Sequence, residues 1–329
     1  MKLLYFSCHS ILEYDELKLF QELGIDWYSL GAYTFPRASG DTKRPIIDYT
    51  PDSWLTEHSP DRDHIPQEFM DHFDTVMIMH MPDWIEKNWH MFKNKRVIWR
   101  TIGQSVPLIE ARMLYYKERG MEIVRYSPKE RNLASYAGES ALIRFYKDPE
   151  EYKNWNGENP TVINFTQSLR QRGTSCGYNL IMNATEGFKR KIYGPENGDL
   201  GKDWGGKVDS VEQMGILRDN RVYFYHGTAP ASYVLSLIEA MMTGIPIVAV
   251  GSGLNKEVFG QDTNEIEDII QNGINGYVSN SMSELRNYIK LLLNDKELAK
   301  KIGEAGRRTA ISLFGKERIK QEWKDFLKI

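Results

Sequence analysis

The sequence has few cysteines, no long apolar run and no large excess of charge of one sign. Cys8 and Cys176 are its only cysteines, too few for a disulfide framework or a cysteine-rich metal site. No run of about 18 apolar residues occurs, and the first residues show no signal-peptide pattern. The formal net charge of -3 gives no general electrostatic footprint for nucleic acid. These absences predict a cytoplasmic protein without a membrane span.

The chain has enough length and apolar content for two folded domains. It contains 329 residues, of which 41% are hydrophobic and 12% aromatic, so sizeable cores can form. Short apolar runs alternate with amphipathic stretches, which predicts an α/β fold with parallel sheets. The polar, turn-rich stretch 147–160 is predicted to link the two halves.

The stretch 221–251 organises the second half. It predicts a strand over 221–226, a helix over 232–243 and a strand over 247–250. Such a unit forms a parallel pair with a right-handed crossover, and ligands bind beyond the carboxyl ends of its strands. The ligand-facing edge is therefore expected to include His226, Gly227, Thr228 and the amides that open the helix. Free amides and the positive end of the helix dipole favour an anion such as phosphate there.

One acid, Glu239, lies on this otherwise nearly uncharged helix. Two interpretations stay open from the residues alone. Glu239 is either a ligand-binding group or else a solvated side chain or a paired structural acid, and Ser232 either contacts ligand or caps the helix.

In the first half, several strands end in polar side chains. The runs 75–80 and 96–102 are predicted strands, which makes His80 and Arg100 candidates for acceptor binding or transition-state stabilisation. The alternative is that each residue closes its strand at the surface. His9 follows the first strand, over 2–7, and is predicted to have a structural or acceptor-orienting role.

Three further stretches have weaker patterns. Residues 32–67 are polar and proline-rich and are predicted to form long loops, residues 130–137 a helix, and residues 194–206 a glycine-rich loop. Within the first of these, Asp61-Arg62-Asp63-His64 invites interpretation as a metal site or a D-x-D motif. Because such triplets are common by chance and no strand end is predicted beside this one, we assign no metal site.

The helix and the strand after it resemble a known family. Leu237-Ile238-Glu239-Ala240-Met241 followed by Thr243-Gly244-Ile245-Pro246-Ile247-Val248-Ala249 resembles the donor-site pattern of retaining GT-B glycosyltransferases. The segments 253–258 and 265–278 resemble the next two parts of that pattern. The resemblance implies two Rossmann-like domains with parallel sheets facing a cleft. The expected bounds are 1–153 for the acceptor domain and 154–312 for the donor domain. A helix over 313–329 is expected to return to the first domain.

The resemblance also implies roles for particular residues in donor binding. Glu239 falls on the glutamate that binds the ribose of a sugar nucleotide. Ala231 stands where the family has the glutamate that holds the transferred sugar, so Ser232, Tyr233 or backbone amides would take part of that role.

Two arginines are implied to bind the donor diphosphate. Arg170 matches the family's arginine, whereas Cys176 stands where its lysine would be, which makes Arg172 the candidate replacement. Gly194 is expected near the nucleotide base. The family's glycine-rich loop after the first strand is missing here, and His9 is the titratable group in its place.

The resemblance predicts a retaining hexosyltransferase that needs neither metal nor cofactor. Its donor would be a nucleoside-diphosphate sugar, expected to be a UDP-sugar, and its acceptor a hydroxyl. A lipid-linked sugar, a protein, a small metabolite and a modified nucleobase all stay open as acceptors. The alternatives are a nucleotide-sugar-binding protein without transfer activity and a GT-B sugar-nucleotide epimerase.

Overall fold

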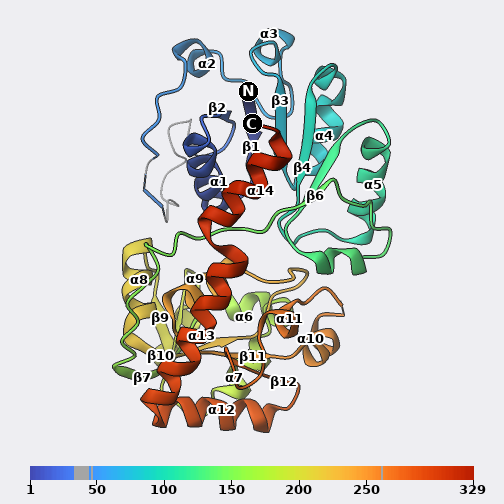
Figure 1. The fold of residues 1–329 in the computed structure, drawn as a ribbon. Helices are drawn as coiled ribbons and strands as arrows, with labels where there is room; N and C mark the ends of the chain where they lie inside the picture. Colours follow the sequence, from blue (N-terminus) through green and yellow to red (C-terminus); the bar gives the residue numbers. More distant parts are fainter. Residues whose placement is uncertain (33–43, 46, 261) are drawn as a thin grey trace. The chain divides into compact units, whose positions relative to one another are not determined.

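The computed structural model describes residues 1–32, 44–45, 47–260 and 262–329. The chain divides into two compact units (Figure 1). Unit 1 comprises Met1–Arg144 and Lys320–Ile329, and unit 2 comprises Phe145–Ile319. The bounds 1–153, 154–312 and 313–329 remain a prediction of domain limits.

Unit 1 is built on a six-stranded parallel sheet with the order β2-β1-β3-β4-β5-β6. Its elements are β1 (Lys2–Phe6), α1 (Ser10–Glu22), β2 (Asp26–Ser29), α2 (Ser53–Glu57), α3 (Gln67–Met70), β3 (Thr75–Met79), α4 (Pro82–Asn88), η1 (Trp89–Phe92), β4 (Arg96–Arg100), α5 (Pro107–Lys117), β5 (Glu122–Arg125), η2 (Pro128–Asn132) and β6 (Ala141–Leu142).

Unit 2 is built on a second six-stranded parallel sheet, with the order β12-β11-β10-β7-β8-β9. Its elements are β7 (Asn159–Phe165), α6 (Leu169–Arg172), η3 (Gly173–Cys176), α7 (Tyr178–Ala184), β8 (Arg190–Tyr193), η4 (Gly198–Asp203), β9 (Trp204–Gly206), α8 (Ser210–Asp219), β10 (Asn220–Tyr225), α9 (Leu235–Thr243), β11 (Ile247–Val250), α10 (Ser252–Phe259), α11 (Ile266–Ile269), β12 (Tyr277–Ser279), α12 (Met282–Asn294), α13 (Lys296–Phe314) and the start of α14 (Lys316–Leu327).

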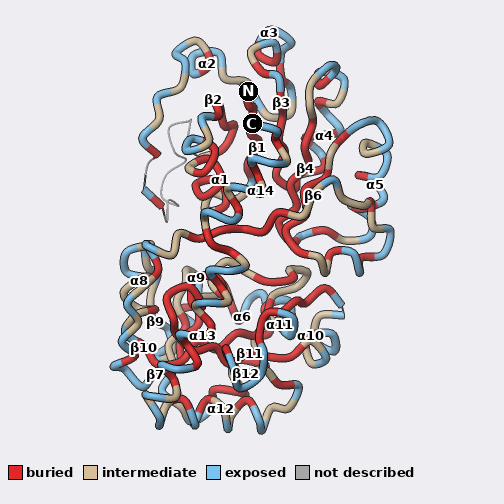
Figure 2. Tube along the Cα trace, viewed as in Figure 1, coloured by how far each residue is buried: buried red, intermediate tan, exposed pale blue. Residues whose placement is uncertain are grey.

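Buried residues lie along the strands of each sheet (Figure 2). All residues of β3 and of β10 are buried, as expected for parallel strands covered on both faces. The last turns of α14 belong to unit 1, where the buried Trp323 ring meets Phe20 edge-on at 5.2 Å. Each unit therefore has its own hydrophobic core.

Two sequence-based expectations are wrong in detail. The helix expected over 130–137 is only the short η2, because Glu130 turns its carboxylate back to the Thr101 hydroxyl (2.7 Å) and the Tyr126 amide (3.2 Å). The loop expected over 194–206 contains η4 and the edge strand β9. Part of the stretch 32–67 lies outside the described residues, and the rest includes α2.

Candidate functional site

The carboxyl ends of β7 and β10 form a polar edge in unit 2. Asn164 donates its amide to the carbonyl of Phe224 (2.9 Å) and accepts the Thr166 hydroxyl (2.6 Å). The same hydroxyl lies 3.3 Å from Nε2 of His226. Because the Thr166 proton goes to Asn164, this contact places the imidazole proton on Nε2. These bonds fix the start of the loop that leads to α9.

His226 is buried and neutral at this edge. Burial, with a smaller contribution from the charge of Arg172, lowers its pKa to about 4. In the described part of the chain, Nδ1 of His226 has no hydrogen-bond partner. The side chain therefore offers an acceptor nitrogen rather than a positive charge.

Gly227 needs to be glycine for two reasons. Its φ of +80° is unfavourable for other residues, and an added Cβ would lie 2.9 Å from Oδ1 of Asn255. Asn255 is itself held by bonds to the carbonyls of Val250 (3.0 Å) and Gly251 (3.1 Å). The loop after β10 thus packs closely on the start of α10.

Helix α9 begins at Leu235, three residues later than the sequence predicts. A turn between Thr228 and Ala231 precedes it, closed by a 2.8 Å backbone hydrogen bond. Val234 is the N-cap residue and supplies no side-chain hydrogen bond to the first turn. The positive end of the helix dipole is therefore not neutralised by a capping side chain.

Ser232 and Tyr233 lie inside the unit, each 1% exposed. The Ser232 carbonyl accepts the Glu265 amide (3.0 Å). The Tyr233 ring packs on the rings of Phe145 and Phe314 at centroid distances of 6.1 and 5.3 Å. In this structure both residues position the loop through contacts within unit 2.

Glu239 is the centre of a buried polar network. Its Oε1 pairs with Nζ of Lys147 at 2.8 Å and accepts the Tyr152 hydroxyl at 3.1 Å. Its Oε2 accepts the amide of Gln213. The Lys147 and Glu239 side chains are only 2% and 4% exposed. Glu239 therefore has a structural role as a paired acid, which is one of the interpretations left open by the sequence.

The predicted phosphate-binding arginines lie at the carboxyl end of β7. Arg170 in α6 is half exposed, with Nε 3.2 Å from Asp199 and its guanidinium 5.5 Å from the Tyr178 ring centroid. Arg172 is exposed two residues later. Gly194, which follows the neighbouring strand β8, has φ +136°, and a Cβ there would lie 2.7 Å from the Thr166 carbonyl. This close approach brings the ends of β7 and β8 together.

Arg100, a unit 1 candidate, is entirely buried. It donates to Glu16 (2.7 Å) and to the Ile143 carbonyl (2.6 Å), and its guanidinium lies 5.3 Å from the Trp323 ring centroid. These contacts join β4, α1 and α14, so the structure gives Arg100 a stabilising role inside unit 1.

His80 and His9 lie at the carboxyl ends of β3 and β1. His80 has a left-handed φ of +60° and is buried, which lowers its pKa to about 4, while Glu110 opposes the shift. Nδ1 of His9 caps α1 by accepting the Leu12 amide at 3.4 Å. The structural role predicted for His9 is thus visible in this contact.

The buried histidines predict that stability rises with pH. His80 and His226 have a folded pKa of about 4 against an ordinary 6.5, so the unfolded state binds two more protons between these values. Burial raises the pKa of Glu130 from 4.5 to about 7, so the folded state binds one more proton at this residue. That proton offsets one of the two extra protons of the unfolded state. Raising the pH from about 5 to about 6 should therefore add about 1 kcal/mol to the free energy of unfolding, measured in urea. His226→Asn should reduce this gain, and stability that falls over the interval would contradict the assignment.

Comparison with solved structures identifies the fold. HepE from Anabaena, in complex with UDP and glucose, is similar at 14% identity with a TM-score of 0.71, covering 100% of this chain and 99% of HepE. Sucrose-phosphate synthase from Thermosynechococcus elongatus has 14% identity and a TM-score of 0.65, with 100% and 98% covered. A glycosyltransferase from Rickettsia africae has 13% identity and a TM-score of 0.67, with 99% and 98% covered. No curated protein matches by sequence.

A family model matches part of unit 2. The model of glycosyl transferases group 1 matches residues 204–309, which include β10, α9 with Glu239, and β11. The chain has the GT-B fold, and its residues 204–309 resemble the glycosyl transferases group 1. The predicted fold class, two Rossmann-like units with parallel sheets, is confirmed.

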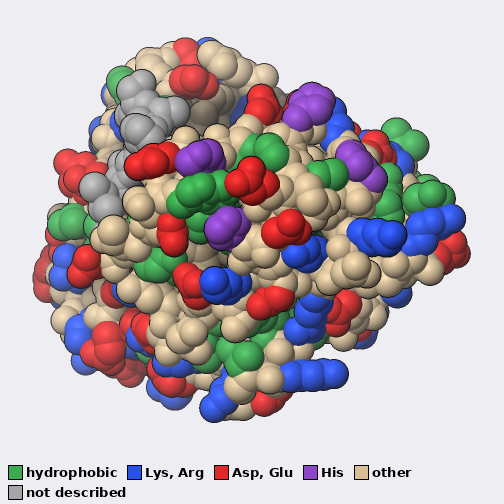
Figure 3. Space-filling view, turned by 90° about the horizontal axis from the view of Figure 1, so that it is seen from above, with side chains coloured by type: hydrophobic (Ala, Val, Ile, Leu, Met, Phe, Trp, Pro, Cys, Tyr) green, Lys and Arg blue, Asp and Glu red, His purple; other side chains and the backbone are tan. Residues whose placement is uncertain are grey.

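Other features of the described residues bear on possible partners. Among the helices of the described residues, none could span a bilayer. Over the same residues, no three His, Cys, Asp or Glu side chains are grouped to hold a metal ion. Acidic and basic side chains intermingle on the face shown in Figure 3 rather than forming a field of one sign.

Three residues that contact Glu239 have no signal in the sequence. Lys147 was placed in the predicted linker, yet it pairs with Glu239. Tyr152 comes from the same stretch, and Gln213 comes from α8. Nothing in their local patterns distinguishes them from surface polar residues.

Proposed function

We propose that this protein is a glycosyltransferase that moves a sugar from a UDP-sugar to an acceptor hydroxyl, with retention of anomeric configuration and without a metal. The observation that carries the proposal is the match of the family model to the β10-α9-β11 unit, where α9 starts without a side-chain cap. HepE, which shares the fold, was solved with UDP and glucose. We further propose that the enzyme works in the cytoplasm.

Stabilisation of the leaving group would supply most of the rate enhancement. As the glycosidic bond breaks, negative charge grows on the diphosphate. Arg170 and Arg172 offer forked donors to its oxygens, and the amides at the start of α9 add the positive end of the helix dipole. In this proposal the two arginines supply the positive charge that a metal ion would otherwise provide.

Glu239 is proposed to hold the ribose hydroxyls and thereby place the anomeric carbon. Lys147 and Tyr152 hold one oxygen of its carboxylate in place. The loop before α9 would line the sugar of the donor, with Gly227, Thr228, Ala231, Ser232 and Tyr233. Gly194 would lie beside the nucleotide base. We propose no side-chain nucleophile, so retention would proceed by attack on the same face from which UDP leaves.

The product's anomeric configuration tests this proposal. We expect the protein to release UDP from UDP-glucose in the presence of EDTA, and NMR to show that the first-formed sugar product keeps the α configuration. A first-formed β product, or activity that EDTA abolishes, would contradict the proposed mechanism. Donor binding without any UDP release would instead favour a binding protein without transfer activity.

A further inference from the structure

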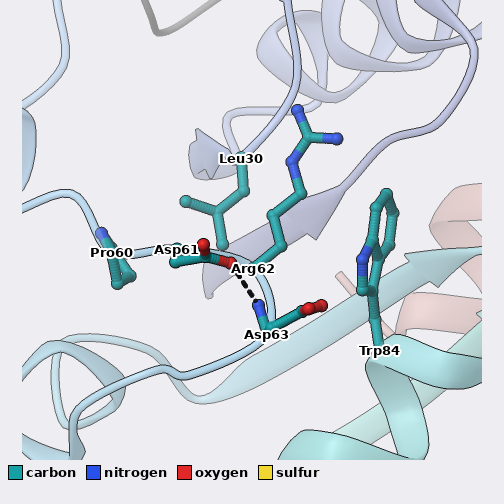
Figure 4. A pocket seen from close by; sticks show the side chains of 6 residues that line it. All are labelled: Leu30, Pro60, Asp61, Arg62, Asp63 and Trp84. Carbon is teal, nitrogen blue, oxygen red and sulfur yellow. Dashed lines mark hydrogen bonds between the residues drawn. The ribbon is translucent and has the colours of Figure 1, made fainter.

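A cavity of about 380 Å³ lies within unit 1. Its lining combines apolar and charged side chains: Leu30, Pro60, Asp61, Arg62, Asp63 and Trp84 (Figure 4). The volume falls in the range of about 300–1,000 Å³ that small-molecule sites occupy. The cavity includes the Asp61-Arg62-Asp63 triplet, to which the sequence assigned no function.

The cavity lies where a parallel sheet binds ligands. Leu30 directly follows β2, and Nη1 of Arg62 lies 3.5 Å from the carbonyl oxygen of Ser7, which directly follows β1. Both contacts mark the carboxyl ends of adjacent strands. Ligands of open α/β sheets bind beyond this edge.

Arg62 is the cavity's main hydrogen-bond donor. Its guanidinium lies 5.1 Å from the centroid of the Trp84 ring, and the Ser7 carbonyl is its other contact, at the outer limit of a hydrogen bond. Within the described ranges, no carboxylate pairs with it. Figure 4 shows its side chain extending between Leu30 on one side and Trp84 on the other. This cation–π contact restrains the guanidinium while leaving N–H groups available.

The charges around the cavity balance. Asp61 accepts the backbone amide of Asp63 (2.8 Å), and Asp63 pairs with Lys87. Two carboxylates are thus matched by Arg62 and Lys87. Because the lining has no net positive charge, an anion would not be attracted and would be repelled by the carboxylates. A lipid tail would have to cover charged groups without replacing their hydrogen bonds.

We propose that this cavity binds a neutral saccharide and that the acceptor of the glycosyltransferase is therefore a sugar hydroxyl. Each hydroxyl both donates and accepts, so one ring can bond the Arg62 guanidinium and the Asp61 carboxylate together. Leu30, Pro60 and Trp84 supply apolar surface for the C–H faces of the ring. The inference rests on the proposed function, because it names the acceptor of that reaction.

Saturation-transfer NMR on the whole protein tests the inference without a donor. The saccharide probes are methyl β-glucoside, methyl β-galactoside, methyl α-mannoside and methyl β-N-acetylglucosaminide, and the anionic probes are inorganic phosphate and glycerol 3-phosphate. At least one glycoside should bind the wild type. Arg62→Ala should weaken its binding about tenfold or more, because a hydrogen bond from a charged donor is lost.

Arg119→Ala is the matched control, because Arg119 also stacks on an aromatic ring, that of Tyr115 at 3.4 Å, but does not line the cavity. It should bind the glycoside as the wild type does. Asp61→Asn separates the ligand classes, since it should weaken a hydroxyl ligand and strengthen an anion. Thermal melting confirms that each variant is folded.

Three results would overturn the inference: no glycoside binds the wild type, Arg62→Ala binds it equally well, or phosphate binds and does so more tightly to Asp61→Asn. Titration of UDP into the same samples separates this inference from the proposed function. UDP binding without glycoside binding defeats only the saccharide cavity. Glycoside binding that depends on Arg62, without UDP binding, defeats only the proposed donor.

Discussion

Replacing Glu239 with Ala is expected to lower the free energy of unfolding by about 3–5 kcal/mol, the usual cost of removing one partner of a buried ion pair. The substitution leaves the Lys147 ammonium, 2% exposed, without its carboxylate and removes the acceptor of the Tyr152 hydroxyl. The apolar stripe of α9, taken by itself, would let the fold tolerate this change, and the buried ion pair reverses that expectation. Urea unfolding followed by tryptophan fluorescence measures the difference.

The control is the double variant Lys147→Met with Glu239→Gln. It removes both charges but keeps side-chain volume and a polar group beside Tyr152 and Gln213, so it should recover much of the lost stability. If Glu239→Ala alone were as stable as the wild type, the ion pair would not have the structural role we assign. The double variant is also the better protein for measuring donor affinity, because it separates ribose binding from unfolding.

Replacing Arg170 with Ala is expected to lower kcat for donor cleavage by about 10²–10³, the range found when one stabilising donor to a developing anion is removed. The fold should be unaffected, because the Arg170 side chain is 51% exposed and its ion pair with Asp199 lies near the surface. Initial rates of UDP release at saturating donor measure the effect.

Arg286→Ala is the matched control for Arg170. Its guanidinium lies 5.4 Å from the Phe188 ring centroid, much as Arg170 lies 5.5 Å from that of Tyr178, but it comes from α12 and bonds the carbonyl of Asn183. Its loss should leave kcat unchanged. Equal rates for Arg170→Ala and Arg286→Ala would remove Arg170 from the proposed mechanism.

The fold could be predicted from local patterns because parallel strands leave strong signals. β10 and β11 are continuous buried runs on either side of a helix with an apolar stripe, and Gly244 ends that helix with φ +93° as a C-cap glycine should. These features lie within about thirty residues of one another, so no long-range contact was needed to see the unit.

The site was harder to predict because its contacts join residues far apart in sequence. Glu239 meets Lys147 across 92 positions, and Arg100 meets Glu16 across 84. The periodicity of apolar residues along the sequence does not indicate such pairs. The cavity around Arg62 was missed for a related reason, since the carboxyl ends of β1 and β2 reach the 60–63 loop only in the folded unit.

A thermal-shift comparison of UDP, GDP, ADP and TDP tests the central claim, that the β10-α9-β11 edge binds the diphosphate of a sugar nucleotide. The account predicts that UDP, at a hundred times its Kd, raises the melting temperature of the wild type by the equivalent of roughly 2.7 kcal/mol. UDP should raise the melting temperature of Arg170→Ala much less. A wild-type melting temperature that none of the four nucleotides changes would contradict it.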